Sequence, residues 1–282
     1  FKQKFNITKI LILITLFCFF IISIGPPSMV DALDYHYGVP LFLLNNSELP
    51  NQDIWLHGSL FGNGELFNAI GLYLKSDNFF TIFQLLSLIL FLEFLINNEK
   101  DNFNLIFIIL FIISSPVIIF LISGPKPLLF PQLLTTAALY ILIKEKKLNA
   151  ECVLLIGILL LGAMQFKLSF ILSCTILGLF TLIRSYKDNK KILLYLVVLS
   201  FFFISPKILY NLSQINDFQL INIFTTLPTP FLENLSQFRD NEFMYPLNLF
   251  ITNSYGGITT MLGFQLLLLL FIKKISKEFF KI

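Results

Sequence analysis

Long apolar runs recur along this chain of 282 residues and constrain its fold more than any other feature. An α-helix needs about 20 mainly apolar residues to cross a bilayer, and several of the runs approach that length. Hydrophobic residues make up 56% of the chain and charged residues only 13%, whereas a soluble domain carries roughly a quarter charged residues. We therefore predict an all-α integral membrane protein, folded as a polytopic helical bundle.

The apolar runs predict about eight spans, and we treat residues 1–282 as a single transmembrane domain. The first run follows three lysines, as a signal peptide does, but no small-x-small cleavage site follows it, so we expect an uncleaved anchor. The fifth and sixth runs nearly meet at Gln165–Lys167, which predicts a tight turn or a broken helix there. The spans are expected at residues 8–25, 79–97, 104–123, 127–143, 151–166, 168–184, 192–209 and 258–272.

The distribution of basic residues predicts the orientation of these spans, because Lys and Arg collect on the cytoplasmic side. A cytoplasmic N-terminus places all but five of the 20 Lys and Arg inside. It leaves two long extracytoplasmic loops, residues 26–78 and 210–257. Within the first loop we expect short surface helices, among them an amphipathic helix over Glu65–Leu74 that lies on the outer membrane surface.

The first outer loop opens with Asp31-Ala-Leu-Asp-Tyr-His36, a concentration of ionisable groups in a chain that has few. Asp31 and Asp34 are three residues apart and would share one face of a helix. Either carboxylate could take the proton of an acceptor hydroxyl, and with His36 the pair could instead bind a divalent cation. The other interpretation is an N-terminal helix cap at Ser28 with solvated charges beyond it. Tyr35 could stack on a sugar ring, although aromatics at a membrane interface need no such role.

Three lysines do not follow the cytoplasmic excess of basic residues, since Lys126, Lys167 and Lys207 all fall at the extracytoplasmic ends of spans. Basic groups at membrane depth are costly unless they are paired or functional, and a lipid-linked phosphate would pair with them. The alternative is that each lysine extends to the lipid headgroups. The chain has no basic stripe interleaved with exposed aromatics, which argues against a nucleic-acid partner.

These elements together resemble the GT-C polytopic glycosyltransferases, which include protein mannosyltransferases, the lipid A aminoarabinose transferase and many bacterial relatives. The resemblance rests on the first span, the Asp31–His36 element, Gly38-Val-Pro40 and a loop ending in Gly62-Asn-Gly-Glu-Leu-Phe67. Short motifs around Lys126, Lys167 and Lys207 add to it, and it covers roughly residues 8–211. Eight spans are fewer than such enzymes usually have, so we expect further sequence beyond the C-terminus. No clear Asp-x-Asp is present, which leaves metal dependence open.

The resemblance implies a glycosyltransferase of the bacterial cytoplasmic membrane with an extracytoplasmic active site. The donor would be a polyprenyl-phosphate sugar, and the acceptor a lipid, a glycan or a protein. Asp31 or Asp34 would act as general base and the three lysines would hold the donor phosphate. His36 and Glu65 would position sugar or acceptor hydroxyls, and Tyr35 would bind the substrate by stacking on a sugar ring. A flippase or transporter for lipid-linked glycans is one rival, and a polysaccharide polymerase or ligase is another.

Overall fold

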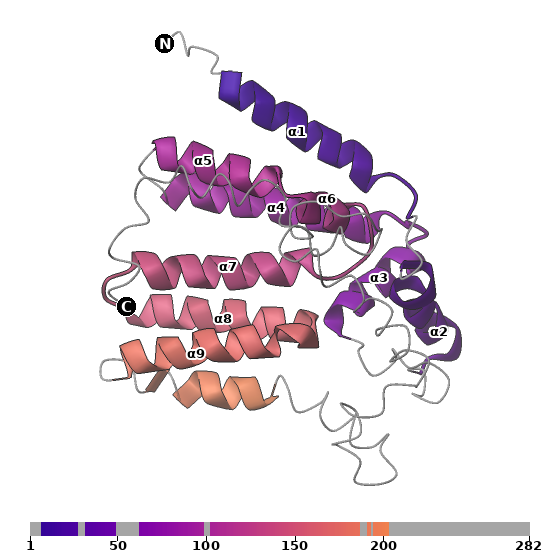
Figure 1. The fold of residues 1–282 in the computed structure, drawn as a ribbon. Coiled ribbons are helices and arrows are strands. Elements are labelled where there is room, and N and C mark those ends of the chain that lie inside the picture. Colours follow the sequence, from indigo (N-terminus) through magenta and orange to yellow (C-terminus); the bar gives the residue numbers. More distant parts are fainter. Residues whose placement is uncertain are drawn as a thin grey trace, which may run out of the picture. The chain divides into compact units, whose positions relative to one another are not determined.

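The computed structural model describes residues 7–27, 32–48, 62–98, 102–186, 191–192 and 194–202. Every regular element in these ranges is a helix, and they contain no β-strand (Figure 1). The all-α part of the predicted fold class is therefore confirmed. The described residues fall into two compact units: unit 1 within 1–19 and 95–120, and unit 2 within 20–94 and 121–217. The expectation of a single transmembrane domain over 1–282 stays a prediction.

Most predicted spans within the described residues correspond to a helix. The helices named in Figure 1 are α1 (Ile7–Ser23), α2 (Gly38–Asn46), α3 (Asn63–Tyr73), α4 (Phe79–Asn98), α5 (Asn102–Ile113), α6 (Pro116–Ile122), α7 (Leu129–Lys144), α8 (Ala150–Phe166) and α9 (Ile171–Ser185). Residues 194–202 are also helical and match part of the predicted span 192–209, whose remainder lies outside the described residues. The predicted span 258–272 also lies outside them.

The stretch 104–123 is interrupted in the structure, and its assignment as a span stays a prediction. The structure has two helices, α5 and α6, that meet at Ser114 and Ser115. The break precedes Pro116, which lacks a backbone N–H and therefore cannot continue the helical hydrogen bonds. Pro116 instead occupies the first position of α6, where a missing N–H costs nothing.

The helices α7, α8 and α9 of unit 2 pack against one another (Figure 1). Along α8 one face is buried, as Val153, Ile156 and Ala163 are 0% exposed. The opposite face is also apolar, and it is not covered by other helices: Leu155 and Ile158 there are 46% and 55% exposed. A helix that is apolar on all sides is typical of a large buried core or of a membrane span.

By length and composition, one described helix, Phe79–Asn98, could cross a membrane. Four shorter apolar helices accompany it, at Ile10–Ser23, Leu129–Lys144, Ala150–Phe166 and Ile171–Ser185. The break predicted at Gln165–Lys167 is confirmed, because α8 ends at Phe166 and Lys167 has extended backbone angles. A short 3₁₀-helix, Leu168–Phe170, then leads into α9.

Arg184, in the last turn of α9, connects that helix to the end of α7. Its guanidinium donates to the carbonyl of Leu142, to that of Glu145 at 2.7 Å and to that of Lys146 at 3.1 Å. The last carbonyls of a helix have no partners within the helix, so an outside donor stabilises them. The planar fork of arginine suits three acceptors better than a single ammonium group does.

We predict that Arg184→Met lowers the free energy of unfolding by about 1–2 kcal/mol, because several carbonyls lose a charged donor at once. Arg184→Lys should recover only a minor part of this loss. Thermal unfolding of the purified protein in detergent measures both effects, with Lys191→Met as the matched control for an exposed basic residue near the end of α9. Equal unfolding temperatures for Arg184→Met and the control would contradict the prediction.

Candidate functional site

Four side chains distant in sequence meet in one buried group in unit 2, here called the Glu65 cluster. Lys167 Nζ lies 2.5 Å from Glu65 Oε1 and 2.6 Å from the Tyr35 hydroxyl oxygen. His36 Nδ1 lies 3.6 Å from the same Glu65 oxygen. Glu65 is 0% exposed and His36 1%, while Tyr35 and Lys167 are 8% and 9% exposed. The cluster therefore brings together a carboxylate, an ammonium group, an imidazole and a phenol away from solvent.

Three different elements supply these side chains. Tyr35 and His36 lie on one turn of π-helix, Ala32–Tyr37, which packs against α2 and α3. Glu65 lies in the first turn of α3, and Lys167 follows the last residue of α8. The hydroxyl of Tyr37 also donates to the carbonyl of Asp77, which attaches the π-helical turn to the chain just before α4.

Two glycines allow the start of α3 to approach the end of α8. A Cβ on Gly62 would lie 2.8 Å from the carbonyl oxygen of Phe166, and one on Gly64 would lie 2.3 Å from Pro127 Cβ. Both distances are too short for real contacts, so larger residues would push α3 away from the end of α8 and from Pro127. Glu65 in turn accepts a hydrogen bond from the backbone N–H of Gly62 at 2.8 Å, and this bond caps the helix.

Charge is tightly balanced inside the cluster. Burial pushes the pKa of Glu65 upward, but His36 and the Lys167 ammonium outweigh it and hold that pKa below its ordinary value. Burial lowers the pKa of Lys167, and Glu65 opposes that shift. Burial and the Glu65 charge both raise the pKa of Tyr35, which stays a neutral phenol. The ammonium also lies 4.7 Å from the centre of the Tyr35 ring, a cation–π distance.

His36 differs from the other members, because neither of its ring nitrogens has a hydrogen-bond partner among the described residues. Its 3.6 Å separation from Glu65 is too long for a hydrogen bond. Burial lowers its pKa, Glu65 opposes this, and the charges of Lys167 and Lys126 lower it further. His36 is therefore a neutral imidazole with a donor and an acceptor to offer. Buried polar atoms without partners are rare, and a site that binds a polar ligand is one explanation for them.

Lys126 lies on a turn that buried amides hold in place beside the cluster. Asn68 of α3 donates to the carbonyl of Pro125 at 3.0 Å. Gln84 of α4 donates to the carbonyls of Leu121 and Gly124 at 2.8 and 3.0 Å, and accepts from the N–H of Leu129 at 3.3 Å. The charge of Lys126 lowers the pKa of both His36 and Lys167, so a second ammonium group acts on the cluster.

Neither Asn68 nor Gln84 was among the candidates from sequence, although each carries a recognisable signal. Gln84 is a polar residue inside an apolar helix, and it is 0% exposed. Asn68 follows Glu65 by three residues, which places both on one face of α3. Asn68 is 1% exposed, and its carbonyl oxygen has no partner among the described residues.

The sequence candidates divide into three groups. Tyr35, His36, Glu65 and Lys167 make direct contact, with Lys126 within electrostatic reach. Asp34 lies on the same π-helical turn and is exposed to solvent. Asp31 and Lys207 lie outside the described residues, so their roles stay predictions. The described residues contain no group of three or more His, Cys, Asp or Glu side chains arranged to hold a metal ion.

The buried neutral state of His36 predicts a pH dependence of stability. The pKa of His36 is lower in the folded chain than in the unfolded one, so the unfolded chain binds more protons below about pH 6.5. Stability should therefore fall as the pH drops from 7 to 5, by up to about 1.4 kcal/mol per pH unit. Glu65 affects stability at lower pH than His36 does, because its stabilising contribution is lost as the pH falls through its lowered pKa.

Unfolding by denaturant in detergent at pH 7, 6 and 5 measures this slope. His36→Gln should flatten it. A His36→Gln variant with the wild-type slope would show that His36 is not buried as a neutral group.

No curated protein and no solved structure matches this chain. Residues 1–280, nearly the whole sequence, match the model of the DUF1420 N-terminal domain. The chain therefore belongs to the DUF1420 family.

Proposed function

We propose that this chain is a membrane glycosyltransferase of the GT-C type that uses a polyprenyl-phosphate sugar as donor. One observation carries the proposal: two lysines act on a buried cluster that holds one carboxylate and an imidazole with unpartnered nitrogens. Such a site sets two ammonium groups near one carboxylate and leaves hydrogen-bonding capacity at the imidazole. A sugar attached to a phosphate offers an anion to the ammonium groups and hydroxyl partners to the imidazole.

The apolar outer faces of the helices support a membrane location. Besides Leu155 and Ile158 of α8, Leu172 and Ile183 of α9 are 70% and 79% exposed. Apolar faces of this extent are costly in water and are stable against lipid tails. We infer a polytopic bundle of about eight spans in a bacterial cytoplasmic membrane, with a cytoplasmic N-terminus and the Glu65 cluster at the extracytoplasmic surface.

The lysines would bind the donor through its phosphate. Lys167 is held by Glu65 and Tyr35, so little rotamer freedom is left for it to lose when the donor binds. As the bond from the sugar to the phosphate oxygen breaks, the bond electrons pass to the phosphate and its negative charge increases. Ammonium groups already fixed beside that oxygen stabilise this charge with little reorganisation, which lowers the barrier.

A carboxylate other than Glu65 would take the acceptor proton. Both Glu65 oxygens already accept hydrogen bonds, and its pKa is held low, so it is a poor base and a good positioning group for Lys167. Asp31 and Asp34 stand at the start of the same loop, and Asp34 is exposed to solvent. One of them would deprotonate the acceptor hydroxyl as it attacks the sugar carbon, while His36 and Tyr35 contact hydroxyls of the sugar or acceptor.

We predict that Lys126→Gln raises the KM for the lipid donor by about tenfold or more, because it removes a charge-assisted contact to phosphate. Lys167→Gln should do the same and should also lower stability, because it leaves the buried Glu65 carboxylate without its charged partner. The KM for the acceptor should change little. Sugar transfer in membranes, with donor and acceptor varied in turn, gives both constants. Lys75→Gln, at an exposed lysine beyond α3, is the control. An unchanged donor KM in both variants would remove the phosphate role.

Asp31→Asn and Asp34→Asn test the general base. We expect one of the two to lower kcat by about 10²–10⁴-fold, since proton transfer by a positioned base contributes that much. Donor binding should persist, because the amide leaves the lysines in place. Glu48→Gln, an exposed carboxylate later in the same loop, should retain normal turnover. Full activity in both Asp variants would end the general-base assignment.

A further inference from the structure

Four exposed basic side chains gather in unit 2 where α7 ends and α8 begins, and they are here called the α7–α8 basic patch. Its members are the last residue of α7, two residues of the connection to α8 and one residue in the last turn of α9: Lys144, Lys146, Lys147 and Arg184. The hydrogen bond from Arg184 to the carbonyl of Lys146 shows that α9 reaches this connection. The patch therefore combines cations from segments that are 38 residues apart.

The backbone that carries the patch is held by contacts of its own. Leu148 is 4% exposed and belongs to the apolar core that α7, α8 and α9 share. Asn149 caps α8, because its side chain accepts a hydrogen bond from the N–H of Cys152 at 2.8 Å. Arg184 holds the other side of the connection through the carbonyls of Glu145 and Lys146. A ligand would therefore order only side chains, which lowers the entropic cost of binding.

The patch and the Glu65 cluster lie at opposite ends of α8. The helix begins at Ala150, next to the patch, and ends at Phe166, next to Lys167, so its 17 residues span about 25 Å. The hydrocarbon core of a bilayer is about 30 Å thick. A membrane that has the Glu65 cluster at one surface would therefore have the patch close to the headgroups of the other surface.

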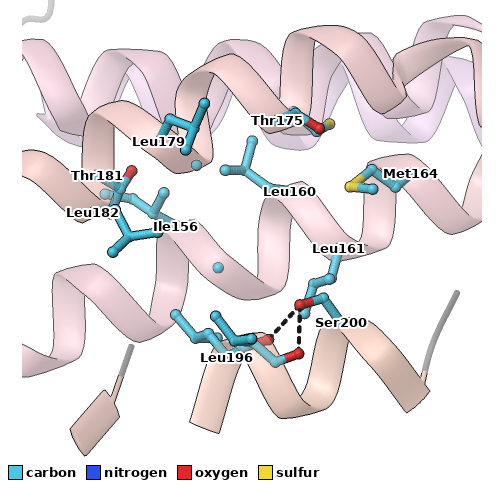
Figure 2. Close-up of a pocket in the computed structure, with 14 residues that line it drawn as sticks. Ile156, Leu160, Leu161, Met164, Thr175, Leu179, Thr181, Leu182, Leu196 and Ser200 are labelled. Atoms are coloured by element: carbon cyan, nitrogen blue, oxygen red, sulfur yellow. Dashed lines mark hydrogen bonds between the residues drawn. The ribbon is translucent and has the colours of Figure 1, made fainter. Parts of the chain in front are cut away.

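Between these two ends the helices are uncharged. The charged residues of α7, α8 and α9 are Lys144, Glu151 and Arg184, and each lies in a first or last turn. The described residues that line the pocket between α8, α9 and residues 194–202 include no charged side chain, and Figure 2 shows leucines from all three helices there. The hydroxyl of Ser200 in this pocket donates to carbonyls of its own helix. Charge is thus confined to the helix ends, as a membrane environment requires.

Exposed apolar side chains border the patch. Ile143 precedes Lys144 and Ile183 precedes Arg184, and both isoleucines are exposed. Lys144 Nζ lies 2.7 Å from the Tyr140 hydroxyl oxygen and 5.0 Å from the centre of the Tyr140 ring. Cations beside exposed apolar side chains, with a tyrosine among them, are typical of the boundary between headgroups and hydrocarbon. A phospholipid presents an anion and a hydrocarbon chain together, whereas a small soluble anion would use only the cations.

We propose that the α7–α8 basic patch binds the headgroups of anionic phospholipids in the cytoplasmic leaflet. Its four cations outnumber the exposed carboxylates of Glu145 and Glu151. Glu151 lies in the first turn of α8, where the helix dipole already stabilises a negative charge. Basic clusters at the cytoplasmic ends of spans attract anionic lipids. The proposal depends on the membrane location and orientation inferred above and not on the chemistry of sugar transfer.

The test uses the full chain in phosphatidylcholine vesicles that contain a small fraction of photoactivatable phosphatidylglycerol or, in a parallel sample, photoactivatable phosphatidylcholine. Peptide mass spectrometry then locates and quantifies the label. We expect phosphatidylglycerol to label the ends of α7 and α9 and their connection more strongly than phosphatidylcholine does. Lys146→Gln with Lys147→Gln should reduce this preference about tenfold, because two charges near the lipid phosphate are lost. The preference of the wild type should also fall in about 1 M salt, which screens exposed charges.

Two controls separate charge at this place from charge in general. Lys146→Arg with Lys147→Arg keeps both charges and should keep the preference, while Lys75→Gln removes an exposed charge between α3 and α4 and should leave it unchanged. Equal labelling by the two lipids, or an undiminished preference in the glutamine pair, would overturn the proposal. An equal loss in Lys75→Gln or in the arginine pair would do the same. Displacement of the lipid by an equal concentration of inorganic phosphate would indicate a site for a free anion and reject the lipid.

Discussion

The ion pair between Lys167 and Glu65 joins segments that are 102 residues apart, and the arrangement of the site depends on it. Removal of two charges from water is expensive, and the mutual attraction repays that cost only with good geometry and further hydrogen bonds. Here Glu65 also accepts from Gly62, and Lys167 also donates to Tyr35. The loss of either partner would leave the other as a buried, uncompensated charge. The ion pair therefore holds α3 and the end of α8 together.

A buried ion pair is weak evidence for stability alone, because apolar residues of similar volume often serve as well. The surroundings of this pair are difficult to explain by stability. Gln84 and Asn68 form four hydrogen bonds to the turn around Lys126, which brings a second positive charge toward Lys167 and His36. Like charges held close repel each other. Under the proposed function, the donor phosphate would bind between them.

The sequence allowed several features to be predicted because their signals are local. Apolar runs located α1, α4, α7, α8 and α9, and the polar interruption at Gln165–Lys167 marked the end of α8. Tyr35, His36, Glu65 and Lys167 were named as candidates, yet their direct contact joins positions up to 132 residues apart, which no local pattern encodes. Asn68 and Gln84 were missed because their partners are backbone carbonyls of a distant turn. The break before Pro116 was locally visible, but the strongly apolar residues on both sides favoured a continuous span.

Rigidity around the two lysines is what the proposed function demands of the site. A charged headgroup needs preorganised partners, because dipoles and charges that must reorganise provide less stabilisation. Glycines, caps and buried amides supply that rigidity around Lys167 and Lys126. Lys167 follows α8 directly, and α8 packs against α7 and α9. Any movement of α8 would shift the ammonium group away from Glu65 and Tyr35, so the packing of these three helices also fixes the geometry of the cluster.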